Sequence, residues 1–226
     1  MSIKENICEV IENIKKYSSH PEKVKLIAVT KYVDENVIEK ILDTGHNILG
    51  ENKAQVIREK IDYFKAKNMD IEWHFIGNLQ KNKVKYIIND VSLIHSVNKL
   101  SLAEEINKRA EQVGKVIDIL LEINIYGEES KQGYKLEELI SDLEALKNLK
   151  NINIKGLMTM GPLDVDEVTT RKVFAELVRI KKELNENYFN NSLTELSMGM
   201  SGDYKIALQE GSTIIRVGSK LYEGIL

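Results

Sequence analysis

The stretch VKLIAVTKYVDENVIEKILDT, residues 24–44, contains the structural unit that recurs along the whole chain. Its first seven residues are apolar or β-branched apart from Lys25, a composition typical of a strand in the interior of a sheet. A polar turn follows, and residues 34–44 have the apolar period of an amphipathic helix. A buried strand that leads directly into a helix is typical of parallel sheets, whose strands are joined by helical crossovers.

Apolar runs alternate with amphipathic segments to the end of the chain. The runs are residues 24–30, 47–50, 72–77, 93–97, 116–124, 152–160, 195–200 and 213–217. The helical patterns between them cover residues 34–44, 54–65, 82–88, 100–113, 136–149, 165–185 and 204–210. This alternation predicts a parallel sheet with right-handed crossovers, and eight strands are the number that closes such a sheet into a barrel. We therefore predict an α/β fold, a single (β/α)8 TIM barrel, with an open doubly wound sheet as the alternative.

One further helix is predicted before the barrel. Ile3, Ile7, Val10, Ile11 and Ile14 share one face of a helical pattern that ends before Pro21. The chain contains no linker, low-complexity stretch or change in composition. We therefore expect residues 1–226 to form one domain.

Composition and charge exclude several classes of protein. Hydrophobic residues make up 42% of the chain and charged residues 30%, as in ordinary soluble globular proteins. The net charge of -3 does not favour a nucleic-acid partner, which requires a basic surface. Cys8 is the single cysteine, which excludes an intramolecular disulfide and fits a reducing compartment. The sequence shows no secretory signal and no apolar run near the roughly 18 residues of a membrane span, so we expect a cytoplasmic protein without membrane contact.

Active sites of such barrels lie where each strand leads into its helix, at the carboxyl ends of the strands. Nearly every predicted strand ends there in polar or glycine residues. They are Lys31, Gly50, Glu51, Asn52, His74, Gly77, Asn78, His95, Ser96, Asn124 and the segments MTMG (158–161), SMGMSGD (197–203) and RVGS (216–219). Polar residues that meet at one rim predict one site.

Lys31 ends the first apolar run, at a position where a buried charge is costly. One interpretation is that the amine reaches out to water. The other is that the barrel mouth partly buries the side chain, and burial disfavours the charged form of an amine. Because a neutral amine attacks aldehydes, the second interpretation predicts a lysine that forms a Schiff base.

Arg216 is the second charged residue in an unusual place. It lies between Ile215 and Val217, so its side chain points into the barrel or into the helix layer. Both places are costly for an unpaired guanidinium. Two partners are open on the sequence: an acid at the rim such as Glu51, or a ring nitrogen of a bound cofactor.

Two segments rich in glycine and serine follow the seventh and eighth strands. GMSGD contains Ser201 and Gly202 in front of a predicted helix, and VGS contains Gly218 and Ser219. The loops after these two strands commonly bind phosphate in barrels. An aldehyde-reactive lysine, a partner for a ring nitrogen and a phosphate site together predict pyridoxal 5'-phosphate as the cofactor.

The histidines do not predict a metal centre, because His20, His46, His74 and His95 lack the close spacing of metal ligands. His95 falls within a strand, and we expect it to be a hydrogen-bonded core residue. His74 precedes FIGNLQ at the end of the third strand and is kept as a candidate for the pocket.

Six motifs of the chain resemble, in the same order, those of the pyridoxal phosphate homeostasis protein family: AVTKY, LGENKAQ, WHFIGNLQKNKVK, GLMTMG, LSMGMSGD and IRVGSKLYEG. The resemblance extends from about Lys25 to Gly224. The resemblance implies the fold-type III barrel shared with the N-terminal domain of alanine racemase. It implies that Lys31 holds the cofactor as an aldimine, that Asn52 and His74 line the pocket and that Arg216 faces the pyridine nitrogen. It also implies that Ser201, Gly202, Gly218 and Ser219 bind the phosphate and that Met200 packs on the ring.

Three functions are open on the sequence. The first is a carrier that binds pyridoxal 5'-phosphate, maintains vitamin B6 and amino-acid homeostasis and supplies apo forms of enzymes that use this cofactor, without strong turnover. The second is a small amino-acid racemase in which Tyr32 or Tyr204 acts opposite Lys31. The third is a Schiff-base aldolase, which leaves Arg216 without a role.

We expect the carrier. An arginine at the pyridine nitrogen weakens the ring as an electron sink, and the second domain that completes alanine racemase does not follow the barrel here. The lack of that domain also favours a monomer.

Overall fold

The computed structural model describes residues 2–125, 132–162 and 165–225. Its strands are β1 (Lys25–Val29), β2 (Ile48–Glu51), β3 (Glu72–Phe75), β4 (Val91–Val97), β5 (Ile117–Glu122), β6 (Ile152–Met158), β7 (Glu195–Met200) and β8 (Ile214–Val217). Each strand pairs in parallel with the next, and β8 pairs with β1 in a register that places Val217 opposite Ala28. The predicted eight-stranded barrel is confirmed, and the open sheet is wrong.

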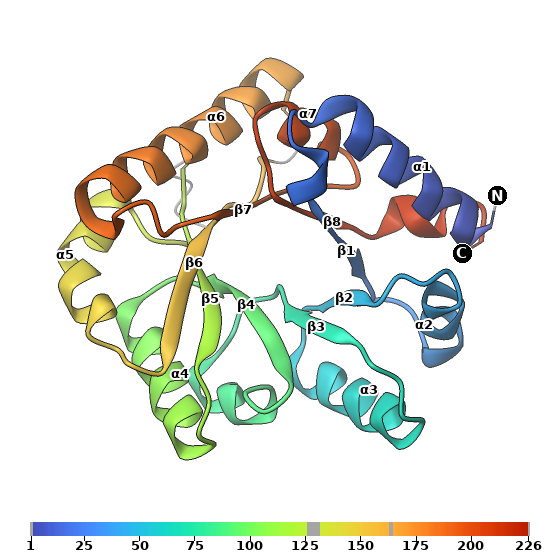
Figure 1. The fold of residues 1–226 in the computed structure, drawn as a ribbon, viewed down its shortest axis with the longest axis horizontal. Coiled ribbons are helices and arrows are strands. Elements are labelled where there is room, and N and C mark those ends of the chain that lie inside the picture. The colour runs from blue at the N-terminus through green and yellow to red at the C-terminus, as the bar shows by residue number, and fades with distance from the viewer. Residues whose placement is uncertain (1, 126–131, 163–164, 226) are drawn as a thin grey trace.

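The helices form an outer ring around the strands (Figure 1). They are α1 (Ile3–Tyr17), α2 (Glu35–Leu42), α3 (Ala54–Ala66), α4 (Leu100–Gln112), α5 (Leu136–Lys147), α6 (Glu167–Leu184) and α7 (Tyr204–Gln209). Shorter segments are the 3-10 helices η1 (Pro21–Lys23), η2 (Lys81–Tyr86) and η4 (Ser219–Tyr222) and the π-helical η3 (Asn185–Phe189). Among the described residues, no helix is both long and apolar enough to cross a membrane.

The helix predicted at residues 82–88 is wrong in type. The chain there forms the 3-10 helix η2, because its backbone hydrogen bonds connect residues three apart, as from Lys83 N to the Gln80 carbonyl at 2.9 Å and from Ile87 N to the Val84 carbonyl at 3.1 Å. The segment still covers the sheet, since Val84 and Ile87 are fully buried in the core.

The apolar core has two parts. The larger part lies between the strands and the helices. The smaller part lies inside the barrel and consists of Ile27, Leu93, Leu120, Met158 and Ile214, with Ile48 packed against it. Buried polar side chains from β3, β4, β7 and β8 share the barrel interior with this smaller part.

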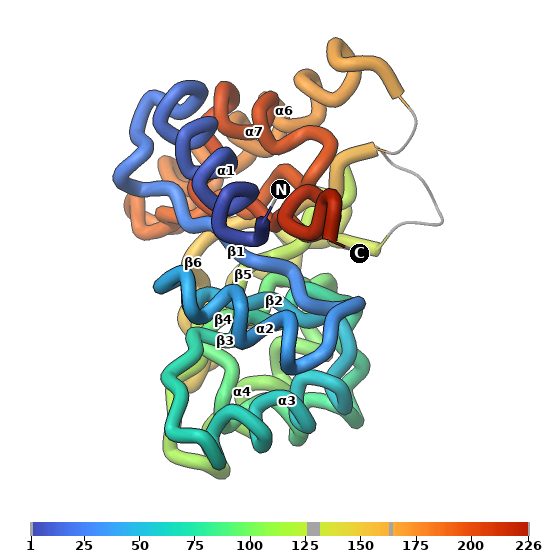
Figure 2. Tube along the Cα trace, turned by 90° about the vertical axis from the view of Figure 1, so that its right-hand side faces the viewer, coloured from blue at the N-terminus to red at the C-terminus, as the bar shows by residue number. Residues whose placement is uncertain are grey.

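Helix α1 joins the start of the chain to the wall of the barrel mouth. Ser2 caps the helix reciprocally with Glu5, with N–H to oxygen distances of 2.7 and 3.3 Å. Asn6 in its first turns donates to the Leu221 and Glu223 carbonyls at 3.0 and 3.1 Å. The two ends of the chain therefore lie side by side (Figure 2), and α1 supports the segment that follows β8.

Candidate functional site

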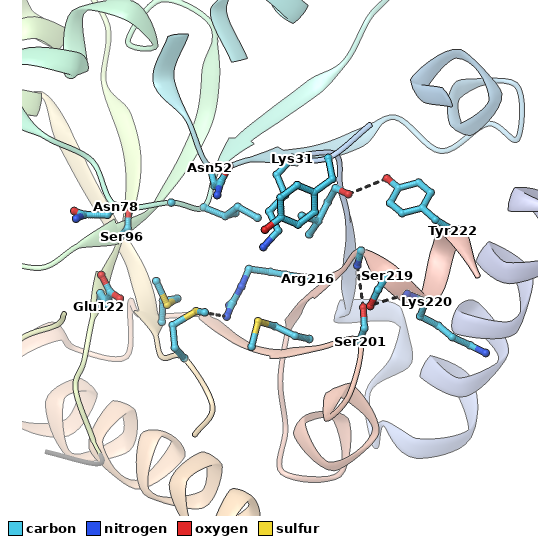
Figure 3. A pocket seen from close by; sticks show the side chains of 18 of the residues that line it. Lys31, Asn52, Asn78, Ser96, Glu122, Ser201, Arg216, Ser219, Lys220 and Tyr222 are labelled. Atoms are coloured by element: carbon cyan, nitrogen blue, oxygen red, sulfur yellow. Dashed lines mark hydrogen bonds between the residues drawn. The ribbon is translucent and has the colours of Figure 1, made fainter. Parts of the chain in front are cut away.

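A cavity of about 1000 Å³ opens at the carboxyl ends of the strands. Such a volume is at the upper end of the range typical of small-molecule sites. Its lining includes seven of the nine site residues that the sequence predicts: Lys31, Asn52, Met200, Ser201, Arg216, Gly218 and Ser219. Figure 3 shows Lys31 and Arg216 in the middle of the cavity, with Ser201 and Ser219 on one side. The predicted rim is thus one site.

Lys31 lies two residues beyond the end of β1 and carries its amine into the open part of the cavity (Figure 3). Its Nζ lies 4.7 Å from the ring centroid of Tyr32, which is 83% exposed. Lys31 makes no hydrogen bond or ion pair with a described residue, and its side chain is exposed. The expected partial burial is therefore wrong for this structure, because the barrel mouth is wide at this point.

The backbone next to Lys31 is fixed from two sides. Tyr222 donates its hydroxyl to the Val29 carbonyl at 2.8 Å, and Lys60 Nζ donates to the Thr30 carbonyl at 2.8 Å. Lys60 also forms a buried ion pair with Glu51, with 2.7 Å between Nζ and Oε2. Since both backbone contacts come from buried side chains, the position of Lys31 is set by the core.

Glu51 has a second role at the end of β2. Its Oε1 accepts a hydrogen bond from the backbone N–H of Asn52 at 2.8 Å, which fixes the turn that presents Asn52 to the cavity. The glycine at position 77 packs so closely on the backbone of Asn52 that a Cβ atom there would overlap with it. Glu51 is therefore a structural partner of Lys60 and Asn52, and the suggestion that it pairs with Arg216 is wrong.

Arg216 points into the barrel and is 3% exposed. Its Nη1 donates to Ser197 Oγ at 2.6 Å, and its Nη2 donates to the Thr159 carbonyl at 3.2 Å and lies 3.4 Å from Met160 Sδ. It forms no ion pair within 4 Å in the part of the chain that the structure describes. Burial lowers the pKa of Arg216 to about 10, although the negative charges of Asp203 and Glu122 oppose this. The guanidinium therefore stays charged at neutral pH, with part of its surface in the cavity.

A line of hydrogen bonds runs from Arg216 through the barrel interior. Ser197 Oγ lies 2.8 Å from His95 Nδ1, and His95 Nε2 lies 2.9 Å from His74 Nδ1. His74 Nε2 lies 2.9 Å from Glu72 Oε1 at the opposite end of the barrel. Burial lowers the pKa of both histidines, so each ring carries a single proton. Because the Glu72 carboxylate only accepts, His74 donates to it through Nε2, His95 in turn donates to His74, and Ser197 donates to His95.

In this arrangement each ring donates through Nε2 and accepts through Nδ1, as a neutral imidazole does. Burial lowers the pKa of His74 and lowers that of His95 well below the usual value, where the charge of Arg216 contributes as well. The expectation that His95 is a satisfied core residue is confirmed.

His74 does not line the cavity. Its side chain is fully buried below the cavity floor, where its two ring nitrogens are used by His95 and Glu72. The placement of His74 in the pocket is therefore wrong, and its connection to the site runs through His95, Ser197 and Arg216.

The loops after β7 and β8 meet at the hydroxyl of Ser201. The backbone N–H groups of Gly218 and Lys220 both donate to Ser201 Oγ, at 3.1 and 3.3 Å (Figure 3). These two bonds occupy the lone pairs of Ser201 Oγ and leave its O–H free to donate toward the cavity. Asp203 Oδ1 accepts from Met200 N at 2.5 Å, which fixes the loop ahead of α7.

Gly202 lies outside this arrangement. It is exposed, does not line the cavity, and a Cβ atom there would meet nothing within 4 Å. The structure therefore does not bring Gly202 together with the other predicted phosphate residues.

Glu122 is a cavity residue that was not among the predicted site residues. It is the last residue of β5, 7% exposed, and burial raises its pKa to about 7. An acid at the end of the apolar run IDILLE was the available sequence signal. Among the described residues, no group of three or more His, Cys, Asp or Glu side chains is placed to hold a metal ion.

Known proteins were compared with this chain. The family model described as alanine racemase, N-terminal domain, matches residues 6–225. The pyridoxal phosphate homeostasis protein of Aquifex aeolicus is 39% identical over 226 residues, which cover 98% of each chain. The chain belongs to the pyridoxal phosphate homeostasis protein family. The resemblance inferred from its motifs is confirmed.

Other members and more distant proteins agree with this assignment. The pyridoxal phosphate homeostasis protein of Synechocystis sp. is 40% identical over 202 residues, 89% of this chain and 92% of that protein. The solved structure of PipY of Synechococcus elongatus with PLP bound has a TM-score of 0.88 and 31% identity, covering 98% of this chain and 100% of that one. An alanine racemase of Clostridium difficile shares the fold, with a TM-score of 0.76, 18% identity and 59% of its chain covered.

Proposed function

We propose that this protein binds pyridoxal 5'-phosphate reversibly and acts in the homeostasis of vitamin B6 and amino acids, without strong turnover of its own. The observation that carries the proposal is that three different groups line one cavity: the free amine of Lys31, the buried guanidinium of Arg216 and the N–H groups that converge at Ser201. The relatives named above and the PLP-bound PipY structure support it.

The residues fit the chemical groups of the cofactor. Pyridoxal 5'-phosphate supplies an aldehyde that reacts reversibly with amines and a ring that can take up negative charge. The Ser201 hydroxyl, whose oxygen accepts from the N–H groups of Gly218 and Lys220 and whose proton remains to be donated, would bind the phosphate together with the Ser219 hydroxyl. Arg216 would donate to the ring nitrogen, and Asn52 and Met200 would border the ring.

Lys31 is the amine that suits the aldehyde. Among the described residues, two lysines line the cavity, Lys31 and Lys220. Lys220 Nζ pairs with Glu9 at 3.1 Å and with Glu223 at 2.7 Å, and these carboxylates raise the pKa of Lys220 and hold it in the charged form. Lys31 has no carboxylate partner among the described residues, and its amine lies in the open part of the cavity, where an aldehyde can reach it.

The properties of Arg216 favour a carrier over an enzyme. With a pKa of about 10 the guanidinium remains a donor, so a ring nitrogen beside it is kept without a proton. Such a nitrogen stabilises a carbanion at the substrate poorly. The racemase alternative also loses one of its two acids, because Tyr204 does not line the cavity and its hydroxyl is engaged by Asn13 at 2.9 Å.

We further infer that residues 1–226 act as one cofactor-binding domain in the cytoplasm and that the recipients of the cofactor are apo forms of enzymes that use it. A monomer is the proposed state, because residues of one chain from all sides of the barrel suffice to line the cavity.

Proton exchange tests this function. Holo-protein is incubated with single L-amino acids in deuterated water, and loss of the α-proton signal is followed by NMR. The expected result is exchange near the rate with the free cofactor, together with passage of the cofactor to an apo-enzyme in the same tube. Exchange at an enzymatic rate, roughly 1–10³ per second, would overturn the carrier. Absence of any visible absorption change when the cofactor is added would overturn cofactor binding itself.

A further inference from the structure

The cavity has a second polar side, across from the phosphate loops. Asn78, Ser96 and Glu122 line it from the ends of three neighbouring strands, β3, β4 and β5. Figure 3 shows these three side chains grouped together, with Lys31 and Arg216 between them and Ser201. The groups assigned to the cofactor leave this side of the cavity without a role.

Ser96 is a buried hydroxyl without a partner. It is 2% exposed, and its Oγ makes no hydrogen bond in the part of the chain that the structure describes. Its direction is unusual, because consecutive strand residues normally face opposite sides of a sheet. The β4–β5 register shifts between Ile94 and Val97, and such an irregularity lets both His95 and Ser96 contribute to the inside of the barrel. A buried polar atom that is left unpaired is costly, which indicates that a ligand satisfies it.

Glu122 is a buried acid, 7% exposed, whose carboxylate makes no hydrogen bond or ion pair with a described residue. Its backbone carbonyl is used by Tyr134 N at 2.7 Å, which fixes the end of β5. Buried carboxylates are normally paired with a cation. The charge of Arg216 acts on Glu122, but its guanidinium donates to Ser197 and Thr159 and lies against Met160.

Three acceptors on one side of a cavity define the kind of ligand. The Glu122 carboxylate, the Ser96 hydroxyl oxygen and the Asn78 side-chain carbonyl suit a cation with three N–H donors, which is the valence of a primary ammonium group. We propose, on the basis of the function proposed above, that Asn78, Ser96 and Glu122 form a subsite for the ammonium group of a small primary amine that shares the cavity with the cofactor.

A subsite of this kind has a clear use beside Lys31. Primary amines react with the same aldehyde that Lys31 would hold, so an amine kept charged at Glu122 is held ready but unreactive. Transfer of its proton to the carboxylate gives a neutral amine and a neutral acid, which balances charge within the cavity. The ligand class is therefore that of free amino acids and other small amines.

The test uses protein loaded with pyridoxal 5'-phosphate and reduced with borohydride, so that the aldehyde no longer reacts with added amine. Ethylamine is titrated into this protein at pH 8, and binding is followed by ligand-observed NMR. Tetramethylammonium, which has the same charge but no N–H group, is the matched probe. We expect saturable binding of ethylamine to the parent and at least tenfold weaker binding to Glu122→Gln, because a charge-assisted hydrogen bond is lost.

Ser96→Ala keeps the acid and should weaken ethylamine binding by about fivefold, the effect of one neutral hydrogen bond. Asp118→Asn, at the other end of β5, is the control change of acid to amide and should leave binding unchanged. Two results would overturn the subsite. One is equal binding of ethylamine and tetramethylammonium to the parent. The other is binding of ethylamine to both Glu122→Gln and Ser96→Ala with the affinity of the parent. Failure of the protein to retain a pyridoxyl group after reduction would instead overturn the proposed function.

Discussion

His95 Nε2 lies 2.9 Å from His74 Nδ1, and this contact connects the cofactor side of the barrel to its opposite end. Both rings are neutral, because burial lowers the pKa of His74 and lowers that of His95 well below its usual value. Arg216 is thus held in place by side chains far below the cavity.

The neutral histidines predict that the protein loses stability in mild acid. Burial lowers the pKa of His95 in the folded state, whereas the unfolded chain takes up a proton near the usual value of 6.5. The stabilising contribution is therefore fully present above pH 6.5 and is lost as pH falls below it, with a slope of about 1.4 kcal/mol per pH unit for each proton.

Urea unfolding between pH 7.5 and 5 measures this slope. In His95→Gln the dependence of the free energy of unfolding on pH should decrease by about one proton. His20→Gln is the matched control, because His20 is exposed and should leave the slope unchanged. A slope in His95→Gln equal to that of the parent would show that His95 is not held neutral.

Glu122 has the opposite effect on stability. Burial raises its pKa from 4.5 to about 7, although the charge of Arg216 opposes this. Between pH 4.5 and pH 7, the folded protein therefore keeps a proton on Glu122 that the unfolded chain has released. Stability from this group is present below pH 4.5 and is lost as pH rises through 7. Relative to the parent, Glu122→Gln should therefore be more stable at pH 8 than at pH 5, by at most about 3 kcal/mol.

Thermal unfolding of ligand-free Glu122→Gln and parent at pH 5 and pH 8 provides the comparison. A difference between the two proteins that stays the same at both pH values would contradict the assignment of the raised pKa to Glu122.

The buried pair Lys60–Glu51 predicts a large effect of a single substitution. Lys60→Met leaves the fully buried Glu51 carboxylate without its cation and removes the contact to the Thr30 carbonyl. We expect a loss of roughly 3–5 kcal/mol in the free energy of unfolding. Lys67→Met, at the end of the same helix, removes an exposed pair with Glu39 and should change the free energy of unfolding far less than Lys60→Met does. Similar losses in denaturant unfolding of the two variants would be evidence against the buried pair.

Much of the fold followed from local pattern. The eight apolar runs and the helices between them needed only the periods of strand and helix, and the position of Lys31 after a buried strand was visible in VKLIAVTKY. The glycine and serine residues after β7 and β8 likewise stood in a place where barrels bind phosphate.

The interior contacts could not be predicted in this way, because their partners are far apart in the chain. Ser197 and His95 are separated by 102 residues, and only closure of the barrel brings them together. The apolar period of the helix does not predict that Lys60 points inward and pairs with Glu51. It therefore also does not predict that Arg216 binds Ser197 instead of Glu51. The direction of Ser96 depends on a register shift in β4, for which strand alternation gives the wrong side.

The phosphate site predicts a selective loss in Ser201→Ala. This substitution removes the hydroxyl on which the Gly218 and Lys220 N–H groups converge. Affinity for pyridoxal 5'-phosphate should fall roughly tenfold, the equivalent of one hydrogen bond to a charged group. Pyridoxal, which has no phosphate, should bind both proteins equally in an absorption titration. Equal losses for the two ligands would place the phosphate elsewhere in the cavity.

The central claim is that Lys31 holds the cofactor, and peptide mapping after borohydride reduction tests it most directly. Holo-protein is reduced, digested and analysed by mass spectrometry. Lys220 is the internal control, since it lines the same cavity but its amine is held by Glu9 and Glu223. The predicted result is one pyridoxyl group per chain on the peptide that contains Lys31, and none in Lys31→Ala. A pyridoxyl group on the peptide of Lys220 or Lys205, with Lys31 unmodified, would contradict the account.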